Sequence, residues 1–300
     1  MASIDIRGVE HAYDLSEPTP NTRSVLVFLH GWLLSRQYWQ PLVDRLAGEF
    51  QCLRYDLRGF GESQPNGDLV LHSHYRYTPA AYAKDLEILL DRLELSEVWL
   101  VGHSLGGTVA LWTAYQFPER VRGVVCVNAG GGIYLKEEFE RFRRAGEQIV
   151  RLRPQWLTQF PLIDWLFARA AVAKPLDRSW GRQRVLDFVS AHPDAARGAL
   201  LDSTTEDEVH RLPQIVSQIH QPVYFVAGAK DTIMEPQYVR HLASFHRLFE
   251  CCGNNVIELE ECGHLSMVER PDVLAENLCS IVLQYEKFDS TDRNDPNCKS

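Results

Sequence analysis

The sequence has no run of about 18 apolar residues, the length that a membrane-spanning helix needs. Its first residues, Met1 to Arg7, lack the basic start and apolar core of a signal peptide. The 7 cysteines include no CxxC pair and no Cys/His set with zinc spacing. Cys251 and Cys252 are adjacent, where a disulfide would be strained. We therefore expect a cytoplasmic protein with reduced cysteines and no transmembrane segment.

The chain also has no excess of positive charge. It holds 31 Lys and Arg against 40 Asp and Glu, for a net charge of −9. This balance argues against general binding to nucleic acid. Hydrophobic residues make up 45% of the sequence and charged residues 24%, which is ordinary for globular proteins. Nothing in the sequence indicates a cofactor, so a small-molecule substrate is the partner we expect.

Residues 98–112 are the most informative stretch, because they predict a strand, a turn and a helix in succession. The turn is Gly102-His103-Ser104-Leu105-Gly106, which fits the G-x-S-x-G nucleophile elbow. Side chains at the two glycines would collide in a turn this sharp. The helix that follows supplies free backbone N–H groups and a positive dipole end, which suit a developing oxyanion. Ser104 is therefore a candidate nucleophile.

Two later segments supply a base and an acid for this serine. Asp231 follows a predicted strand at 222–228, and His264 follows another at 256–259. Serine needs an imidazole to take its proton, and the imidazole needs a carboxylate to fix its tautomer. The order Ser104, Asp231, His264 is the order in α/β-hydrolases. All three follow predicted strands, where open α/β sheets place their sites.

Further motifs match the same family. A predicted strand at 25–29 runs into His30-Gly31-Trp32, and residues 56–63 read D-x-R-G-x-G-x-S. Near the end come Gly263-His264 and a Glu-x-Pro at 269–271. Over about residues 4 to 286, the chain resembles the α/β-hydrolase family, in its serine esterase and lipase-like branch with a helical cap. The resemblance implies an oxyanion hole from the backbone N–H groups of Trp32 and Leu105. It also implies substrate contacts from Gly31, Trp32 and Leu33.

The alternation of helices and strands predicts an α/β fold with a mostly parallel central sheet covered by helices on both faces. We expect the core to comprise residues 1–129 and 212–286. Residues 130–211 would form a helical cap, or lid, inserted into that core. The polar, aperiodic residues 287–300 would be a disordered tail.

The expected cap is locally basic and aromatic. Residues 131–200 hold 12 Lys and Arg against 8 Asp and Glu, or +4, which leaves −13 for the rest of the chain. Its large apolar residues are Trp156, Phe160, Trp165, Leu166, Phe167 and Trp180. One interpretation is that this roof recruits an amphiphilic or anionic substrate, or touches a lipid surface. The favoured one is that amphipathic helices bury the aromatic side chains and expose the arginines.

Other residues have weaker claims to a role. We expect His103 to pack beneath the elbow rather than to react, and Trp39 to lie in a helix core. His72 and His74 lack the neighbouring carboxylates of a metal site. Asn128 follows a predicted strand at 121–127, where some relatives place the acid, but an amide cannot serve as that carboxylate. Asp202 and Asp207 remain weak competitors of Asp231.

A serine at the elbow disfavours epoxide hydrolases and haloalkane dehalogenases, which the resemblance associates with an aspartate there. It favours acyl chemistry, with a carboxylic ester of apolar or amphiphilic character as the expected substrate. Two alternatives stay open. One is a specialised biosynthetic hydrolase, lyase or thioesterase acting on an anionic substrate. The other is a binding protein of this fold that does not catalyse a reaction.

Overall fold

The computed structural model describes residues 2–65, 77–130, 136–250 and 253–292. Within them, an eight-stranded sheet has the order β1-β2-β4-β3-β5-β6-β7-β8. β1 pairs antiparallel with β2, β2 pairs antiparallel with β4, and the other pairings are parallel. The strands are β1 (Ala2–Ile6), β2 (Val9–Leu15), β3 (Val25–Leu29), β4 (Gln51–Tyr55), β5 (Val98–His103), β6 (Val121–Val127), β7 (Val223–Gly228) and β8 (Val256–Leu259). The mostly parallel α/β sheet predicted from the sequence is confirmed.

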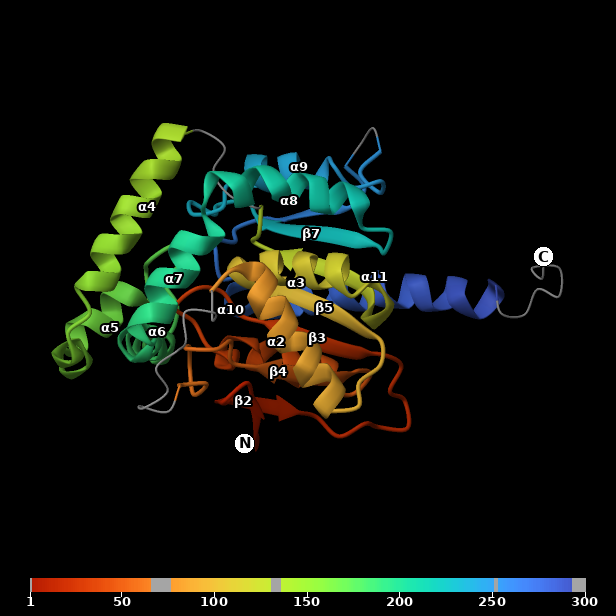
Figure 1. Ribbon diagram of the computed structural model, residues 1–300, viewed down its shortest axis with the longest axis horizontal. Coiled ribbons are helices and arrows are strands. Elements are labelled where there is room, and N and C mark those ends of the chain that lie inside the picture. Colours follow the sequence, from red (N-terminus) through yellow and green to blue (C-terminus); the bar gives the residue numbers. More distant parts are fainter. Residues whose placement is uncertain (1, 66–76, 131–135, 251–252, 293–300) are drawn as a thin grey trace.

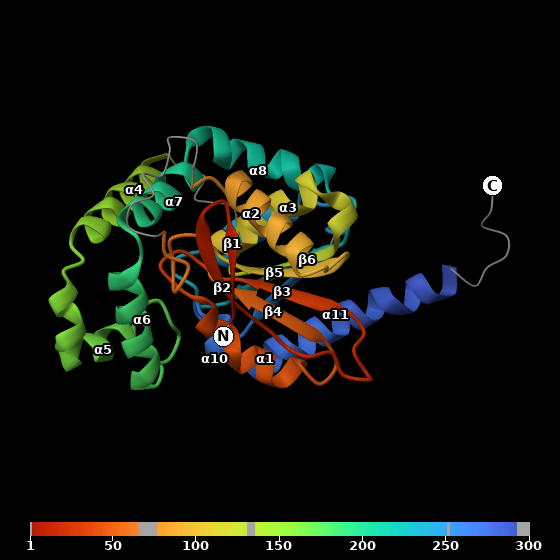
Figure 2. The ribbon, with the colours of Figure 1, turned by 60° about the horizontal axis from the view of Figure 1, so that its bottom comes forward.

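The central strands are buried because helices cover both faces of the sheet. All six residues of β5 and six of the seven in β6 are buried, as is typical of parallel sheets. Figure 2 shows α2, α3 and α8 on one side of the sheet, with α1 and α11 on the other. These five helices are α1 (Gln40–Leu46), α2 (Pro79–Arg92), α3 (Leu105–Gln116), α8 (Glu206–Gln218) and α11 (Pro271–Asp292). Two shorter helices, α9 (Pro236–Ala243) and α10 (Ser266–Glu269), follow β7 and β8. No described helix is long and apolar enough to cross a membrane.

Local sequence sets several of these boundaries. Thr78 caps α2, since its hydroxyl accepts a hydrogen bond from the Ala81 N–H, and Pro79 takes the first helical position. A short 3₁₀ turn, Arg36–Trp39, precedes α1. Trp39 is fully buried there against Phe28, which agrees with its expected place in a helix core.

A helical insertion separates β6 from β7. It contains α4 (Lys136–Arg151), the 3₁₀ turn η3 (Gln155–Gln159), α5 (Pro161–Phe167), α6 (Arg178–Ser190) and α7 (Pro193–Ser203) before α8. Figure 1 shows α4 to α7 gathered to one side of the sheet. The expected cap boundary at residue 211 falls inside α8, a continuous helix whose buried face packs in the core cluster with α3. The division into core and cap domains itself stays a prediction.

The C-terminal tail begins later than the composition suggests. Residues 287–300 are polar and were expected to lack structure, but α11 continues to Asp292. A helix already anchored in the core can extend through polar residues, because adding a turn avoids the cost of nucleation. The rest of the expected tail lies outside the described residues.

The favoured interpretation of the aromatic residues in the insertion is wrong for three of them. Trp156, Phe160 and Trp165 are 51–53% exposed, and Leu166 is exposed as well. Two others do pack inward: Phe167 contacts Phe188, and Trp180 contacts Tyr38. Figures 1 and 2 show α5 on the side of the insertion away from the sheet, and no other described helix covers that side.

Candidate active site

Ser104 occupies a strained turn between β5 and α3. Its backbone has φ 51° and ψ −116°, a region that non-glycine residues rarely occupy. The flanking glycines allow this turn to pack closely. A Cβ on Gly102 would lie 2.3 Å from the Gly106 carbonyl oxygen, and one on Gly106 would lie 2.3 Å from the carbonyl oxygen of Leu29. These close approaches supply the steric reason that the sequence predicts for the glycines.

His264 and Asp231 are in direct contact. The Nδ1 of His264 lies 2.8 Å from Oδ2 of Asp231. An ionised carboxylate only accepts hydrogen bonds, so Nδ1 must carry the proton. In the neutral ring Nε2 is then unprotonated and able to accept a proton. The loop after β7 and the loop after β8 bring the two residues together across 33 positions of sequence.

Asp231 is held by two further backbone groups. The N–H groups of Ile233 and Met234 donate to its Oδ1 at 2.8 and 2.9 Å. Burial acts to raise the pKa of the Asp231 carboxyl, but the neighbouring His264 and these hydrogen bonds hold the pKa below its ordinary value. The group is therefore a carboxylate at neutral pH, as an orienting acid must be.

Asn128 is a further partner of this carboxylate that the sequence interpretation did not foresee. Its Nδ2 donates to Asp231 Oδ2 at 2.8 Å and to the Gly263 carbonyl at 3.0 Å, while its Oδ1 accepts from Ser266. Asn128 has a φ of 49°, which asparagine tolerates better than most residues. Its place at the end of β6, beside the expected site, is the signal in the sequence that points to such a role.

His103 lies directly beneath His264. The two rings are 4.8 Å apart, and His103 Nε2 donates to the His264 carbonyl at 2.7 Å. Its Nδ1 is buried without a hydrogen-bond partner, and a Cβ on Gly31 would lie 2.6 Å from it. Burial, followed by the neighbouring His264, lowers the pKa of His103 to about 3. A neutral, packed imidazole agrees with the structural role expected for this residue.

The insertion reaches down to hold the backbone of His264. The His264 N–H donates to the carbonyl of Ala171, in the segment after α5, at 2.8 Å. Gly263 has no room for a side chain, since a Cβ would lie 2.7 Å from the N of Ala173. The carboxylate of Glu269 accepts from the N–H groups of both Gly263 and Ala173 at 2.9 and 2.8 Å. The Glu of the Glu-x-Pro segment thus ties the His264 loop to the insertion.

A cavity of about 920 Å³ lies between the strand ends and the insertion. Ser104, His264, Trp32, Leu33 and Leu105 line it from the core side. Apolar side chains of the insertion line the opposite wall, among them Phe142, Ile149, Phe167, Phe188 and Leu200. The cavity is therefore mostly apolar, with the candidate nucleophile and base at one wall.

One cation reaches this cavity from the insertion. Arg184 is the only Lys or Arg among the described residues that line it. Its Nη1 donates to the carbonyls of Phe167 and Ala170 at 2.6 Å each, which anchors the guanidinium. Burial lowers the pKa of Arg184, but arginine remains protonated throughout the physiological range.

Gly31, expected to contact substrate, is not among the described residues that line the cavity; it packs on His103 instead. Trp32 is in place, and its indole Nε1 donates to the Ala196 carbonyl at 2.8 Å. Leu33 has a φ of 57°. Trp32 and Leu105 both line the cavity that Ser104 lines. The structure thus brings together the five residues Ser104, His264, Trp32, Leu33 and Leu105, with Asp231 behind His264.

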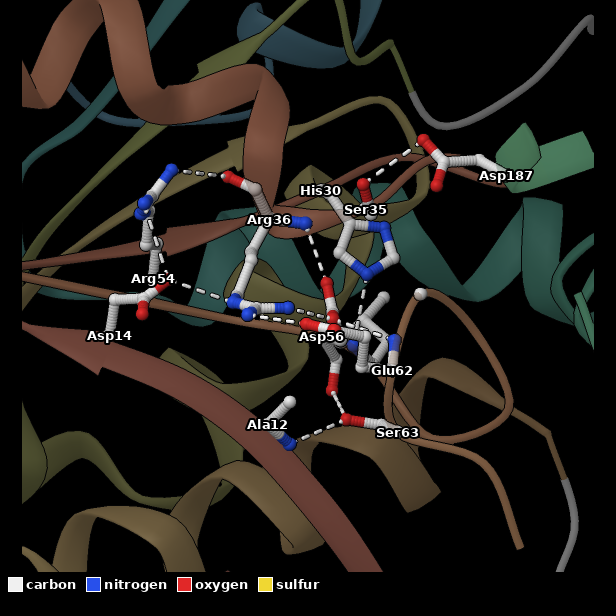
Figure 3. Close-up of polar contacts among 12 residues, drawn as sticks. Ala12, Asp14, His30, Ser35, Arg36, Arg54, Asp56, Glu62, Ser63 and Asp187 are labelled. Carbon is white, nitrogen blue, oxygen red and sulfur yellow. Dashed lines mark hydrogen bonds and ion pairs between the residues drawn. The ribbon is translucent and has the colours of Figure 1, made fainter. Parts of the chain in front are cut away.

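A network of buried ion pairs supports the loop that carries Trp32. Figure 3 shows Asp56 at its centre, accepting from the backbone and guanidinium of Arg36 and from the Glu62 N–H. His30 Nε2 accepts from the Leu57 N–H at 2.9 Å, so the loop after β3 is joined to the loop after β4. The D-x-R-G-x-G-x-S segment therefore supports the loop after β3.

Asp202 and Asp207 do not line the cavity. Asp202 accepts from the Tyr77 N–H at 3.1 Å, and Asp207 is in the first turn of α8. His72, His74, Cys251 and Cys252 lie outside the described residues. Among the described residues, no group of three or more His, Cys, Asp or Glu is placed to hold a metal ion.

Comparison with known proteins adds the family. The family model of the alpha/beta hydrolase fold matches residues 24–271. An uncharacterized protein of Mycobacterium tuberculosis is 28% identical over 280 residues, covering 89% of this chain and 76% of that protein. The pimeloyl-[acyl-carrier protein] methyl ester esterase of Yersinia enterocolitica is 34% identical over 118 residues, 39% of this chain and 41% of the esterase.

Among solved structures, a thermophilic esterase from Thermogutta terrifontis superposes with a TM-score of 0.73 at 22% identity. The alignment covers 95% of this chain and 99% of the esterase. This likeness shows a common fold, and the family model spans most of the chain from before β3 to the start of α11. The chain belongs to the α/β-hydrolase fold family, as its motifs predict.

Proposed function

We propose that the protein hydrolyses carboxylic esters through an acyl-enzyme on Ser104. In this proposal His264 is the general base, Asp231 orients and stabilises it, and the backbone N–H groups of Trp32 and Leu105 form the oxyanion hole. Residues 130–211 act as a cap that shapes the acyl pocket. The observation that carries the proposal is the 2.8 Å contact of His264 with Asp231, on a histidine that lines the same cavity as Ser104.

The reaction would proceed in two halves. The Ser104 hydroxyl attacks the ester carbonyl while His264 Nε2 takes its proton, and the oxyanion accepts hydrogen bonds from the two backbone N–H groups. The bond to the alcohol oxygen then breaks, and His264 returns the proton to the leaving group. Water attacks the acyl-enzyme in the same way, which releases the acid and restores Ser104.

The cavity and the relatives support an ester as substrate. Its largely apolar walls suit an acyl chain, because each buried CH₂ contributes about 0.8 kcal/mol. Two similar proteins, from Yersinia enterocolitica and Thermogutta terrifontis, are also named as esterases. We retain the cytoplasm as the proposed location, since the four described cysteines are unpaired and such usage favours a reducing compartment.

The first test is labelling with a fluorophosphonate probe, followed by turnover of p-nitrophenyl esters from acetyl to palmitoyl. Wild type should be labelled and active, whereas Ser104→Ala should be folded and inert. The matched control is Ser203→Ala, because Ser203 lines the same cavity but donates its hydroxyl to its own helix. Ser203→Ala should still be labelled by the probe and should still turn over the esters. Absence of labelling in wild type would remove the proposal and favour a binding protein of this fold.

A second candidate substrate class is favoured by Arg184. A guanidinium in an apolar cavity attracts a carboxylate or phosphate strongly, since little water screens it. An anionic acyl substrate, such as an ester or thioester bearing a second acidic group, would meet this requirement. Labelling without turnover of p-nitrophenyl esters would point to this specialised class. Comparison of Arg184→Met with wild type on neutral and carboxylate-bearing esters would decide between the two classes.

A further inference from the structure

Exposed apolar side chains are concentrated on one part of the insertion. Seven large ones lie between residues 149 and 166, with 47–77% of their surface exposed. We call this set the apolar cap face; its members are Ile149, Leu152, Trp156, Phe160, Leu162, Trp165 and Leu166. Elsewhere among the described residues the exposed large apolar side chains are Leu186, Ile233 and Phe245, at 38–40%. Clusters of this kind mark interaction sites.

The outward orientation of this face is fixed by contacts on its inner side. Asp164 of α5 is 5% exposed and lies 3.7 Å from both Arg178 and Arg182 of α6. At Gly181 the two helices approach so closely that a Cβ would meet the Asp164 carbonyl. Asp164 of α5 faces α6, and Ile163 and Phe167 line the cavity. The other large apolar residues of this helix, Leu162, Trp165 and Leu166, are exposed. Both ribbon views place α5 on the side of the insertion away from the sheet.

The apolar cap face lies within a longer stretch, residues 149–182, that is basic in an otherwise acidic protein. Residues 149–182 contain 6 Lys and Arg against 2 Asp and Glu, or +4, while the whole chain carries −9. Arg169 stacks on the ring of Trp165, with its guanidinium carbon 3.6 Å from the ring centre. Arg151 is exposed beside Leu152. Tryptophan with arginine at an apolar surface is the composition that binds the headgroup region of anionic membranes.

The positive charge of residues 149–182 distinguishes between two occupants of the apolar cap face. A second copy of the chain would place the same positive segment against itself, because a twofold interface is self-complementary. An anionic lipid surface instead carries the opposite charge and accepts the apolar side chains among its acyl chains. Charge complementarity therefore favours a lipid surface.

The face is also continuous with the cavity. Ile149 and Leu152 are both exposed at the surface and part of the cavity lining, 47% and 72% exposed respectively. These two residues therefore belong both to the apolar cap face and to the apolar wall of the cavity that Ser104 lines. We infer that the apolar cap face docks on an anionic lipid surface, from which an acyl chain can enter the cavity without crossing water. Docking does not depend on the chemistry of Ser104; the delivery of substrate rests on the proposed function.

Co-sedimentation with vesicles tests the docking. The full chain should bind phosphatidylcholine–phosphatidylglycerol vesicles, and bind pure phosphatidylcholine vesicles more weakly. Trp156→Ser with Trp165→Ser should reduce binding to the mixed vesicles at least tenfold. The matched control is Phe245→Ser, an exposed aromatic residue outside the face, which should bind like wild type. Thermal unfolding by circular dichroism verifies that each variant is folded.

Two further double variants test how much positive charge contributes to vesicle binding. Arg151→Gln with Arg169→Gln should weaken binding to the mixed vesicles about thirtyfold in low salt, since each basic residue contributes about 1 kcal/mol. Arg23→Gln with Lys84→Gln removes the same charge from exposed positions elsewhere and should have little effect. High salt should remove the difference between the two pairs.

Each contrary result overturns the inference. Equal vesicle binding by wild type and the tryptophan variant would place the lipid contact elsewhere. Absence of vesicle binding, together with a concentration-dependent dimer that the tryptophan variant loses in sedimentation velocity, would assign the face to a second copy. Because Ser104→Ala should bind vesicles like wild type, loss of esterase activity and loss of docking are observed separately.

Discussion

The amide of Asn128 and the carboxylate of Asp231 lie 2.8 Å apart, from Nδ2 to Oδ2, on the same oxygen that contacts His264. The end of β6 therefore helps to position a residue beyond β7. Asn128 also reaches the carbonyl of Gly263, directly before His264. One side chain thus fixes Asp231 and the loop of His264 relative to each other.

Asn128→Ala should lower kcat for p-nitrophenyl acetate about 10- to 100-fold with little change in KM. The reason is that a hydrogen bond to a charged group contributes about 1.5–3 kcal/mol, here to the orientation of the acid. Steady-state kinetics on the purified variant measure the effect. Asn277→Ala, which loses only a bond to its own helix, serves as the control. An unchanged kcat would show that Asp231 keeps its position without the amide.

Asp231→Asn should reduce kcat about 10⁴-fold, by analogy with the serine proteases, because an amide can favour the wrong tautomer of His264. Combination with Ser104→Ala should cause little further loss, since the two residues act as a unit. Single-turnover measurements with a p-nitrophenyl ester separate the acylation step. Near-normal acylation in the single variant would assign the acid role to another residue.

Asp187 should make the protein less stable as pH rises toward neutrality. Burial raises the pKa of Asp187 to about 7, whereas an unfolded Asp titrates near 4. Between about pH 4 and 7 the folded state therefore holds more protons than the unfolded state. The free energy of unfolding falls as pH rises through this window. Thermal melting of wild type between pH 4 and 8 should show the decline.

Asp187→Asn is the matched variant for this pH dependence. It keeps a group that can bond to Ser35 but cannot ionise. Its melting temperature should vary less than that of wild type between pH 4 and 8. Parallel curves for the two proteins would show that Asp187 does not cause the decline.

Gly106→Ala should prevent formation of the stable fold, because the new Cβ would lie 2.3 Å from a backbone oxygen of β3. Backbone atoms in the middle of a sheet cannot move aside without breaking the strand pairing. Gly48→Ala is the control, since nothing lies within 4 Å of its Cβ. The measurement is the yield of soluble protein with its melting temperature. Equal stability of the two variants would contradict the packing argument.

Much of the core could be predicted because its signals are local. β6 runs from Val121 to Val127 as its β-branched residues indicate, and Thr78-Pro79 starts α2 as its capping residues indicate. The turn at Ser104 depends on close contacts between segments that are near in sequence or lie on neighbouring strands. For these elements the residue types alone are enough to predict the local structure.

The rest depends on contacts between distant segments. The hydrogen bond from Asn128 to Asp231 spans 103 positions, and no periodic pattern in the sequence indicates it. Trp165 has a place in an apolar pattern, but exposure depends on whether another layer of the protein covers α5. Gly31 follows a strand, as the resemblance implies. It nevertheless packs against the ring of His103 and does not line the cavity. Such features are set by tertiary structure, which overrides local expectation.

The bond from the His264 N–H to the Ala171 carbonyl joins the segment after α5 directly to the residue that we propose as the general base. Only residues 168–170 separate the end of α5 from this bond. A force on the outer surface of α5, such as that from a bound partner, would therefore reach the imidazole without passing through the sheet. The insertion would then set how fast the serine is activated, in addition to which molecules enter.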